Sequence, residues 1–171
     1  MRSKIVLRPL VLVSLVLAVA CLPAPAAAQF QSFMNIPGQP GESKVIGHEN
    51  EIELMSYMQS ALAKGCLNVV AVKGLDKASP GLAFLAVFKQ IVPMVTVTLT
   101  RTTADTPVDV FTAVLEQVSL VSVELSEFDG GPAPVERVTL QPRRATLSYR
   151  QQNPDGSPAP PVTATLDCQR P

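Results

Sequence analysis

The sequence predicts a mainly β domain, an antiparallel barrel or sandwich of about seven to eight strands with one flanking α-helix. Most segments after residue 28 alternate apolar and polar residues or are rich in β-branched residues, and turn signals separate them at intervals of roughly 8–12 residues. Only one segment, residues 79–92, has the start signal and the long apolar body of a helix. No internal repeat or long low-complexity linker divides the chain, so we expect a single domain.

Three strands are expected before the helix. Residues 30–36 (FQSFMNI) form a short first strand, and the loop PGQPGES follows, because Pro fixes φ and Gly admits positive φ. Residues 52–59 alternate imperfectly between two faces, which is typical of a half-buried strand. Residues 67–73 (LNVVAVK) are rich in β-branched side chains and predict the third strand.

The helix is expected to begin at Ser79, which can cap it, with Pro80 in the first turn. Its body is GLAFLAVFKQIV, and Pro93 is expected to end it. The helix is apolar around most of its circumference, so it must be covered on more than one side, by the sheet or by another subunit. The residues that we assign to the helix and its interface are Ser79, Pro80, Leu82, Leu85 and Phe88.

The second half of the domain reads as strands. MVTVTLTR alternates cleanly between valine or leucine and threonine. Residues 108–128 predict either two strands or one bent strand. Three later candidates are VERVTL, ATLSYR and VTATLD, and Pro142 predicts a break, bulge or edge between the first two.

The first 28 residues have the pattern of a secretory signal peptide. Three basic residues precede an apolar stretch at 9–20, and small residues stand at Ala26 and Ala28. The apolar stretch is too short to cross a bilayer of roughly 30 Å, so we expect no stable membrane span after its removal. We expect cleavage between Ala28 and Gln29, which leaves the domain 29–171 exported, in the periplasm or secreted.

A lipoprotein signal is the alternative, because Cys21 directly follows the apolar stretch. Ala18 stands where such signals favour Leu, and the Ala-x-Ala site fits better. Cleavage after Ala28 leaves Cys66 and Cys168, and an oxidising compartment favours a disulfide between them. The signal removes basic residues only, so the domain is mildly acidic and unsuited to nucleic acid.

The single histidine, His48, is the first candidate for catalysis. With Ser43 and either Glu49 or Glu51 it supplies the residue types of a nucleophile and its base. No glycine-flanked nucleophile turn accompanies them, and phosphate-loop and dinucleotide signatures are absent. We therefore interpret His48 as a polar loop residue before a strand, and we expect no enzymatic activity.

Metal and nucleic-acid sites are also disfavoured. Cys66, Cys168 and His48 lack the short spacing of zinc ligands, and a structural zinc site takes four. Arg143 and Arg144 form the centre of the basic cluster, but strand alternation puts them on opposite faces and few aromatic residues accompany them. We expect no metal and no cofactor.

The segment 37–57 resembles the opening of one family, the haemolysin-coregulated proteins (Hcp) of type VI secretion. It reads PGQPGESKVIGHENEIELMSY, in which a G-x-x-G-E-S loop and a loop histidine precede an acidic-aliphatic strand that ends in an aromatic residue. The loop residues that match the family motif are Gly41, Glu42, Ser43 and His48.

Two further stretches match in order and spacing. DKASP, residues 76–80, precedes Pro93 and an alternating strand. LEQVSLVSVELS, GGPAPVERVTL and the later Tyr149 are similar to the family's late strands. Together the three stretches extend the resemblance over residues 30–150.

The resemblance implies a closed or nearly closed antiparallel β-barrel with one flanking helix. Members of the family assemble as hexameric rings, which stack into the inner tube of a contractile secretion machine and carry effectors. We therefore expect a non-enzymatic, ring-forming structural protein. Its partners would be further copies of itself, components of the secretion machine and effector proteins.

Several features depart from the family pattern. The family's tube proteins carry no cleavable signal, and the segment between Tyr57 and Asn68 is short where the family often has a long loop. Lys89 stands where a helix-ending Gly is common, and the tail has Cys168 in place of an aromatic ending. These departures support an alternative from another class, a monomeric periplasmic or surface binding module.

Overall fold

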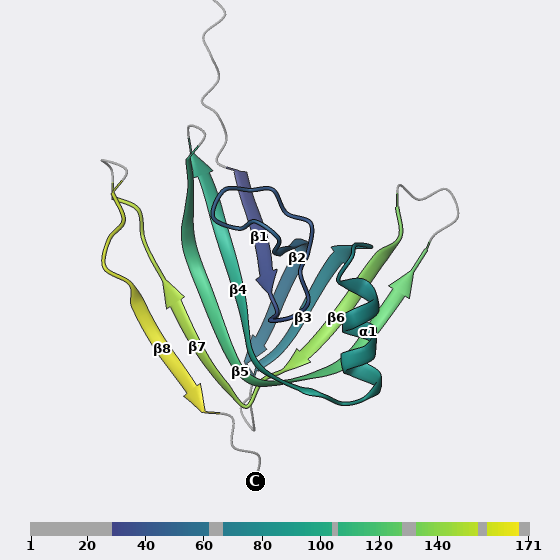
Figure 1. The fold of residues 1–171 in the computed structure, drawn as a ribbon. Helices are drawn as coiled ribbons and strands as arrows, with labels where there is room; N and C mark the ends of the chain where they lie inside the picture. Colours follow the sequence, from purple (N-terminus) through teal and green to yellow (C-terminus); the bar gives the residue numbers. More distant parts are fainter. Residues whose placement is uncertain (1–28, 62–66, 104–105, 128–132, 154–156, 168–171) are drawn as a thin grey trace, which may run out of the picture.

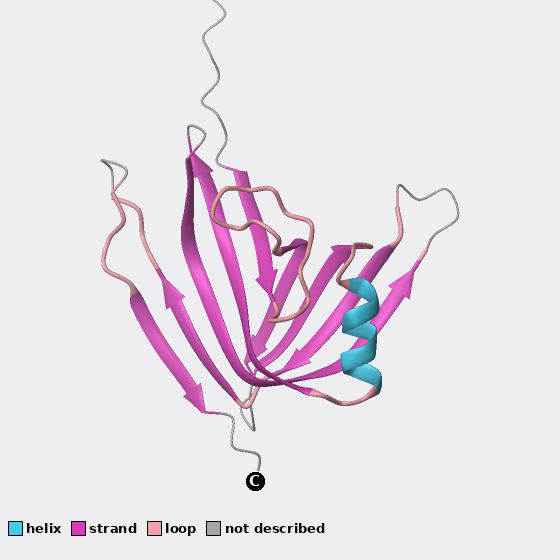
Figure 2. Ribbon diagram, viewed as in Figure 1, coloured by secondary structure: helices cyan, strands magenta, loops and turns pink. Residues whose placement is uncertain are grey.

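The computed structural model describes residues 29–61, 67–103, 106–127, 133–153 and 157–167, which form one antiparallel sheet and one helix (Figures 1 and 2). The elements in chain order are β1 (Gln29–Asn35), β2 (Ile52–Ala61), β3 (Leu67–Gly74), α1 (Ser79–Val87), β4 (Ile91–Thr103), β5 (Thr106–Ser126), β6 (Val135–Gln141), β7 (Arg144–Tyr149) and β8 (Val162–Asp167). This confirms the predicted fold class.

Six of the strands close into a barrel. The strand order is β4-β1-β2-β3-β6-β5-β7-β8, and β4 also pairs with β5, so the ring β4-β1-β2-β3-β6-β5 returns to its start. Every pairing is antiparallel. Closure leaves the six ring strands with few open edges.

The long strand β5 connects the barrel to an outer hairpin. One edge of β5 pairs with β4. β5 also pairs with β7 over residues 111–116 and with β6 over residues 119–126. A register shift between Leu120 and Ser122 and a positive φ of 53° at Gln117 accompany the change of partner. The segment is therefore one bent strand, the second of the two arrangements that the sequence left open.

The strands β7 and β8 extend the sheet beyond the barrel. β7 pairs with β5 and β8 pairs with β7, and Figure 1 shows the pair on the side away from α1. The break predicted at Pro142 is confirmed, since β6 ends at Gln141 and β7 begins at Arg144. Among the described strands, β8 therefore has one edge without a partner strand.

The helix is shorter than predicted. It ends at Val87, and the peptide N–H groups of Lys89 and Gln90 donate to the carbonyl oxygens of Ala86 and Leu85. This is the pattern of a Schellman motif, with Lys89 at a φ of 49° in the place usually taken by glycine. The predicted end at Pro93 is therefore wrong, because no glycine marks the actual end of the helix.

Pro93 lies inside β4 instead of ending the helix. β4 pairs with β5 from Ile91 onward, but its pairing with β1 begins only at Thr96. The missing N–H of Pro93 is tolerated because this part of β4 has one open edge.

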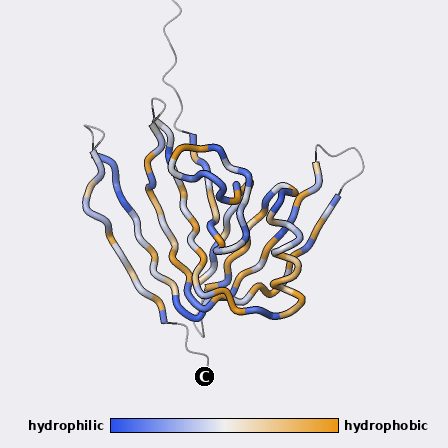
Figure 3. Tube along the Cα trace, in the orientation of Figure 1, coloured by the Kyte–Doolittle hydropathy of each residue, from blue (hydrophilic) through white to orange (hydrophobic). Residues whose placement is uncertain are grey.

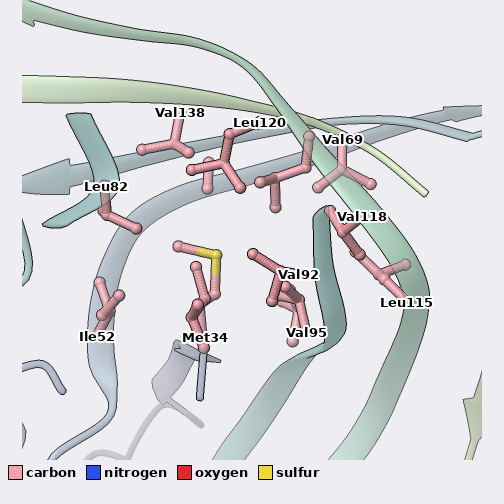
Figure 4. Close-up of a cluster of buried hydrophobic side chains, with 14 of the residues drawn as sticks. Met34, Ile52, Val69, Leu82, Val92, Val95, Leu115, Val118, Leu120 and Val138 are labelled. Carbon is pink, nitrogen blue, oxygen red and sulfur yellow. The ribbon is translucent and has the colours of Figure 1, made fainter. Parts of the chain in front are cut away.

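The core fills the barrel and continues under the helix. Apolar residues alternate with polar ones along the strands (Figure 3), and the inward set includes Met34, Val69, Leu115 and Val118. Leu82 of α1 enters the same cluster beside Ile52 (Figure 4). The helix packs mainly on β5, so the sheet covers one of its faces.

Candidate functional site: the 41–51 loop, the start of α1 and its exposed face

The loop that carries the family motif is held by backbone hydrogen bonds. The N–H of Gly41 donates to the carbonyl of Asn50 (2.7 Å), the N–H of Ser43 donates to the carbonyl of Glu51 (3.1 Å), and the N–H of Asn50 donates to the carbonyl of Ser43 (2.9 Å). A Cβ on Gly41 would lie 2.2 Å from the carbonyl oxygen of Glu51. Glycine is therefore required at Gly41 because two backbone segments approach too closely for any side chain.

Glu42 and Ser43 serve the local structure in different ways. Glu42 is exposed and its Oε1 accepts a bond from the N–H of Lys77 (3.2 Å), which ties the loop to the start of the helix. Ser43 is fully buried, and its Oγ accepts from the N–H of Val45 (3.2 Å). Both residues thus shape the loop.

His48 is itself buried and is the centre of a polar cluster, a role that the sequence did not indicate. Its ring stacks on Phe33 at a centroid distance of 4.2 Å. Nδ1 lies 2.9 Å from Glu51 Oε2 and Nε2 lies 3.1 Å from Asp109 Oδ1, so carboxylates face both ring nitrogens. The Thr100 hydroxyl bonds Asp109 and also lies 3.1 Å from Nε2. His48 therefore fastens the loop to β4 and β5.

This geometry does not assemble Ser43, His48 and a glutamate into a nucleophile and its base. Glu51 does contact His48, but the Ser43 hydroxyl bonds the backbone of Val45 instead of the ring. Glu49 bonds the N–H of Gly47. His48 and Ser43 are both buried, so neither is presented to a substrate.

A second buried cluster explains the DKASP motif. The Lys73 ammonium, fully buried on the core face of β3, lies 2.8 Å from Asp76, 2.7 Å from Glu136 and 2.9 Å from the Ser79 hydroxyl. Its three N–H donors are thereby all satisfied. Ser79 Oγ in turn donates to Glu136 (2.5 Å) and accepts from the N–H of Asp76.

Ser79 therefore does not cap the helix as predicted. Ala78 is the N-cap residue, without a side-chain cap, and Ser79 is the first helical residue, with Pro80 following in the first turn as expected. Asp76 Oδ1 accepts the N–H of Ala78 (2.9 Å), which forms an Asx turn just before the helix. The hydroxyl of Ser79 instead belongs to the ion cluster.

Lys73 and Glu136 are functional residues that the sequence patterns did not single out, although Lys73 carries a recognisable signal. Lys73 continues the inward phase of Leu67, Val69 and Ala71 along β3, where a charged residue needs an opposite charge. Glu136 is its direct cross-strand partner on β6. The pairing of β3 with β6 was the missing information, because these strands are far apart in the sequence.

The helix residues predicted for the core or an interface separate into two groups. Leu82 and Leu85 are buried in the chain's own core, together with Ser79. Pro80 and Phe88 are exposed, and the ring of Phe88 lies 4.4 Å from that of Phe84, which is also exposed, with the two ring planes tilted by 42°. Only the second group is available to another molecule.

The remaining assignments fall largely outside the described residues. Cys66, Cys168, Cys21 and Ala28 are not described, so the disulfide and the cleavage site stay predictions. Gln29, the first residue after the expected cleavage, begins β1.

The described part of the chain offers no obvious chemistry. No group of three or more His, Cys, Asp or Glu side chains within it could hold a metal ion. Within the same residues, the helix falls short of the length and apolar character needed to span a membrane. Burial raises the pKa of Tyr57, whose hydroxyl donates to Gln59, so this tyrosine stays neutral.

This chain is similar in sequence to one protein family. The model of the family described as "Type VI secretion system effector, Hcp" matches residues 33–149. No curated protein matches the chain.

Solved structures share the fold. Hcp1 from Salmonella typhimurium is 23% identical with a TM-score of 0.71, and the match covers 81% of this chain and 94% of that one. A type VI secretion system effector from Yersinia pestis gives 21% identity and a TM-score of 0.68, over 80% and 98% of the two chains. A structure titled as a type six secretion system protein gives 20% identity and a TM-score of 0.73, over 81% and 96%. The family match across most of the domain therefore shows that this chain belongs to the Hcp family of type VI secretion.

Proposed function

We propose that this chain is an exported structural protein that assembles as a homomeric, hexameric ring and acts as a tube component or effector carrier in type VI secretion. Membership of the Hcp family supports the proposal. The observation that carries it is an exposed apolar surface on α1. No catalytic arrangement is required, because such a protein works through its surfaces.

The outer face of α1 is strongly apolar. Phe84, Val87 and Phe88 are between half and three-quarters exposed, and Ile91 and Met94 are nearly half exposed just beyond the helix. We call these five residues the helix patch. Exposed apolar residues that gather in one place are typical of protein–protein contacts.

A ring also needs a second, different surface. Identical copies close into a ring through head-to-tail contacts, in which one patch meets another patch of the next copy. The hairpin β7–β8 lies on the side of the barrel away from α1 (Figure 1), and β8 has an open edge with Val162 exposed. We therefore propose that the helix patch of one copy packs on the β7–β8 hairpin of the next.

The test of assembly is the native mass of residues 29–171, together with negative-stain images. We expect a ring of six copies. Phe88→Glu should reduce the mass to that of a monomer without lowering the melting temperature by more than a few degrees, because Phe88 contributes little to its own core. Met55→Glu is the matched control: Met55 is equally exposed on β2, so its variant should still form rings. Wild-type mass in Phe88→Glu would exclude the helix patch from the interface.

Leu85→Glu separates folding from assembly. Leu85 is 9% exposed and packs in the core, so a carboxylate there would be buried without a partner. We expect this variant to unfold or to melt far below the wild type.

Export is proposed on the signal pattern of residues 1–28. N-terminal mass analysis of the exported protein should give a chain that begins at Gln29. A lipidated chain beginning at Cys21 would contradict this and support the anchored form.

The second candidate function is a monomeric periplasmic or surface binding module. The short connection between β2, which ends at Ala61, and β3, which begins at Leu67, favours it, since it provides no long loop to reach a neighbouring copy. A monomer at high concentration in the mass measurement would favour this function over the ring.

A further inference from the structure

A cavity lies beside the start of β1, and the ring proposal does not involve it. Its volume is about 280 Å³. Strands β1, β4 and β5, the end of β7 and the segment after it form its walls, and the lining residues are Phe30, Arg101, Val110, Tyr149, Arg150, Gln151 and Gln152. We call it the Arg101 cavity.

The charge of the lining is positive. Arg101 and Arg150 contribute two guanidinium groups, and no Asp or Glu lines the cavity. Asp109, next to Val110 in β5, is engaged by His48 and Thr100. The cavity therefore lacks an acidic side chain of its own to balance the two arginines.

One N–H donor of Arg101 has no acceptor within the described residues. Its Nη2 donates to Gln152 Oε1, which orients the guanidinium. Its Nε is buried and has no acceptor among the described residues. A buried N–H without an acceptor is unfavourable, so an anion that reached it would recover this loss.

Besides the two arginines and the two glutamines, the lining consists of Val110 and two aromatic rings. Phe30 and Tyr149 are 62% and 52% exposed, so both rings remain accessible from solvent. Guanidinium groups bind carboxylates through paired hydrogen bonds, and aromatic rings stack with other flat groups. A cavity near the lower end of the range for small-molecule sites, roughly 300–1,000 Å³, admits only a small group.

We propose that the Arg101 cavity binds a carboxylate carried on a flat apolar body of about the size of benzoate. The carboxylate accepts from Arg101 and Arg150, and the apolar body lies against Phe30 and Tyr149. This chemistry has two sources, a free aromatic acid or the C-terminal carboxylate of a polypeptide that ends in an aromatic residue. The site does not depend on ring formation.

Isothermal titration calorimetry of residues 29–171 with sodium benzoate tests the proposal, and benzamide serves as the neutral control. We expect saturable binding of benzoate at one site per chain and at least tenfold weaker binding of benzamide, since charge-assisted hydrogen bonds account for about a factor of ten or more. Equal binding of the two compounds, or no binding of benzoate, would overturn the proposal.

Variants locate the site. Arg101→Gln should weaken benzoate binding about tenfold or more. Arg150→Gln should also weaken it and, because Arg150 is exposed, should fold even if Arg101→Gln does not. Arg143→Gln is the matched control, since Arg143 is exposed, carries the same charge and lies outside the cavity. Wild-type affinity in Arg150→Gln and in any folded Arg101→Gln would refute the assignment.

A second titration, with a peptide, distinguishes a free aromatic acid from a polypeptide C-terminus as the ligand. The tripeptide Gly-Gly-Phe with a free C-terminus is compared with its C-terminal amide. Tighter binding of the free peptide than of benzoate identifies a polypeptide terminus, and weaker binding identifies a free acid. Equal binding of the peptide and its amide would contradict carboxylate recognition in either form.

Discussion

The buried ion cluster at the start of α1 makes a specific prediction about stability. Lys73 is fully buried, and Glu136 is 4% exposed. Replacing Lys73 by Met removes the cation while Glu136 remains buried with only the Ser79 hydroxyl as a donor. Removal of one member of a buried ion pair typically destabilises a protein by about 3–5 kcal/mol, because the other charge is left uncompensated. We expect Lys73→Met to lose this amount of unfolding free energy.

The double variant Lys73→Met/Glu136→Leu is the internal test. It replaces the pair by apolar side chains, and such replacements are often neutral or stabilising relative to the intact pair. We expect the double variant to be more stable than Lys73→Met alone by about 2 kcal/mol or more, which is within the range of coupling energies for residues in contact.

An exposed ion pair provides the control. Arg144 and Glu116 lie 3.5 Å apart on β7 and β5 and are about half exposed. Arg144→Met should cost less than about 1 kcal/mol, because solvent weakens the attraction. Urea denaturation of all three variants gives the free energies. If Lys73→Met costs no more than Arg144→Met, or if Glu136→Leu does not relieve it, the burial argument is wrong.

Three further predictions concern the loop, the helix end and the cysteines. Gly41→Ala should destabilise the domain by about 1–3 kcal/mol in urea denaturation, since its Cβ would overlap backbone; Gly74→Ala, where a Cβ meets nothing, is the control and should change little. Lys89→Gly should raise the unfolding free energy by up to about 1 kcal/mol, because glycine adopts the left-handed conformation at this helix end without strain, and an unchanged urea midpoint would contradict this. Thiol titration of denatured, unreduced protein should find Cys66 and Cys168 bonded, and two free thiols per chain would exclude the disulfide.

Local sequence patterns predicted most of the strands. The alternation in β3 and β4 depends on side chains that meet the core at every second residue, and this period is visible without knowledge of the partner strand. The break at Pro142 was predicted because proline cannot continue a ladder of backbone hydrogen bonds. The family motif around Gly41 was recognised, and the structure supplies its physical reason in a close backbone approach.

Patterns of this kind failed where an element ends without its usual residue. The helix stops at Val87 with Lys89 in a left-handed conformation, and the following residues join β4 despite Pro93. Pairing of β4 with β5 decides this end, because the first residues of β4, 91–95, find their partner strand only in β5, which lies further along the chain.

In the candidate site, too, some features follow from local sequence and others only from the tertiary structure. The sequence by itself determined which residues belong to the loop and the helix start, and it identified His48 and Ser79 as polar residues in motif positions. Only the tertiary structure decided what they do: Asp109 reaches His48 across 61 residues of sequence, and Glu136 reaches Lys73 across 63. A buried polar group must find its partner in space, and barrel closure brings these partners together from strands whose separation in sequence gives no sign of their contact.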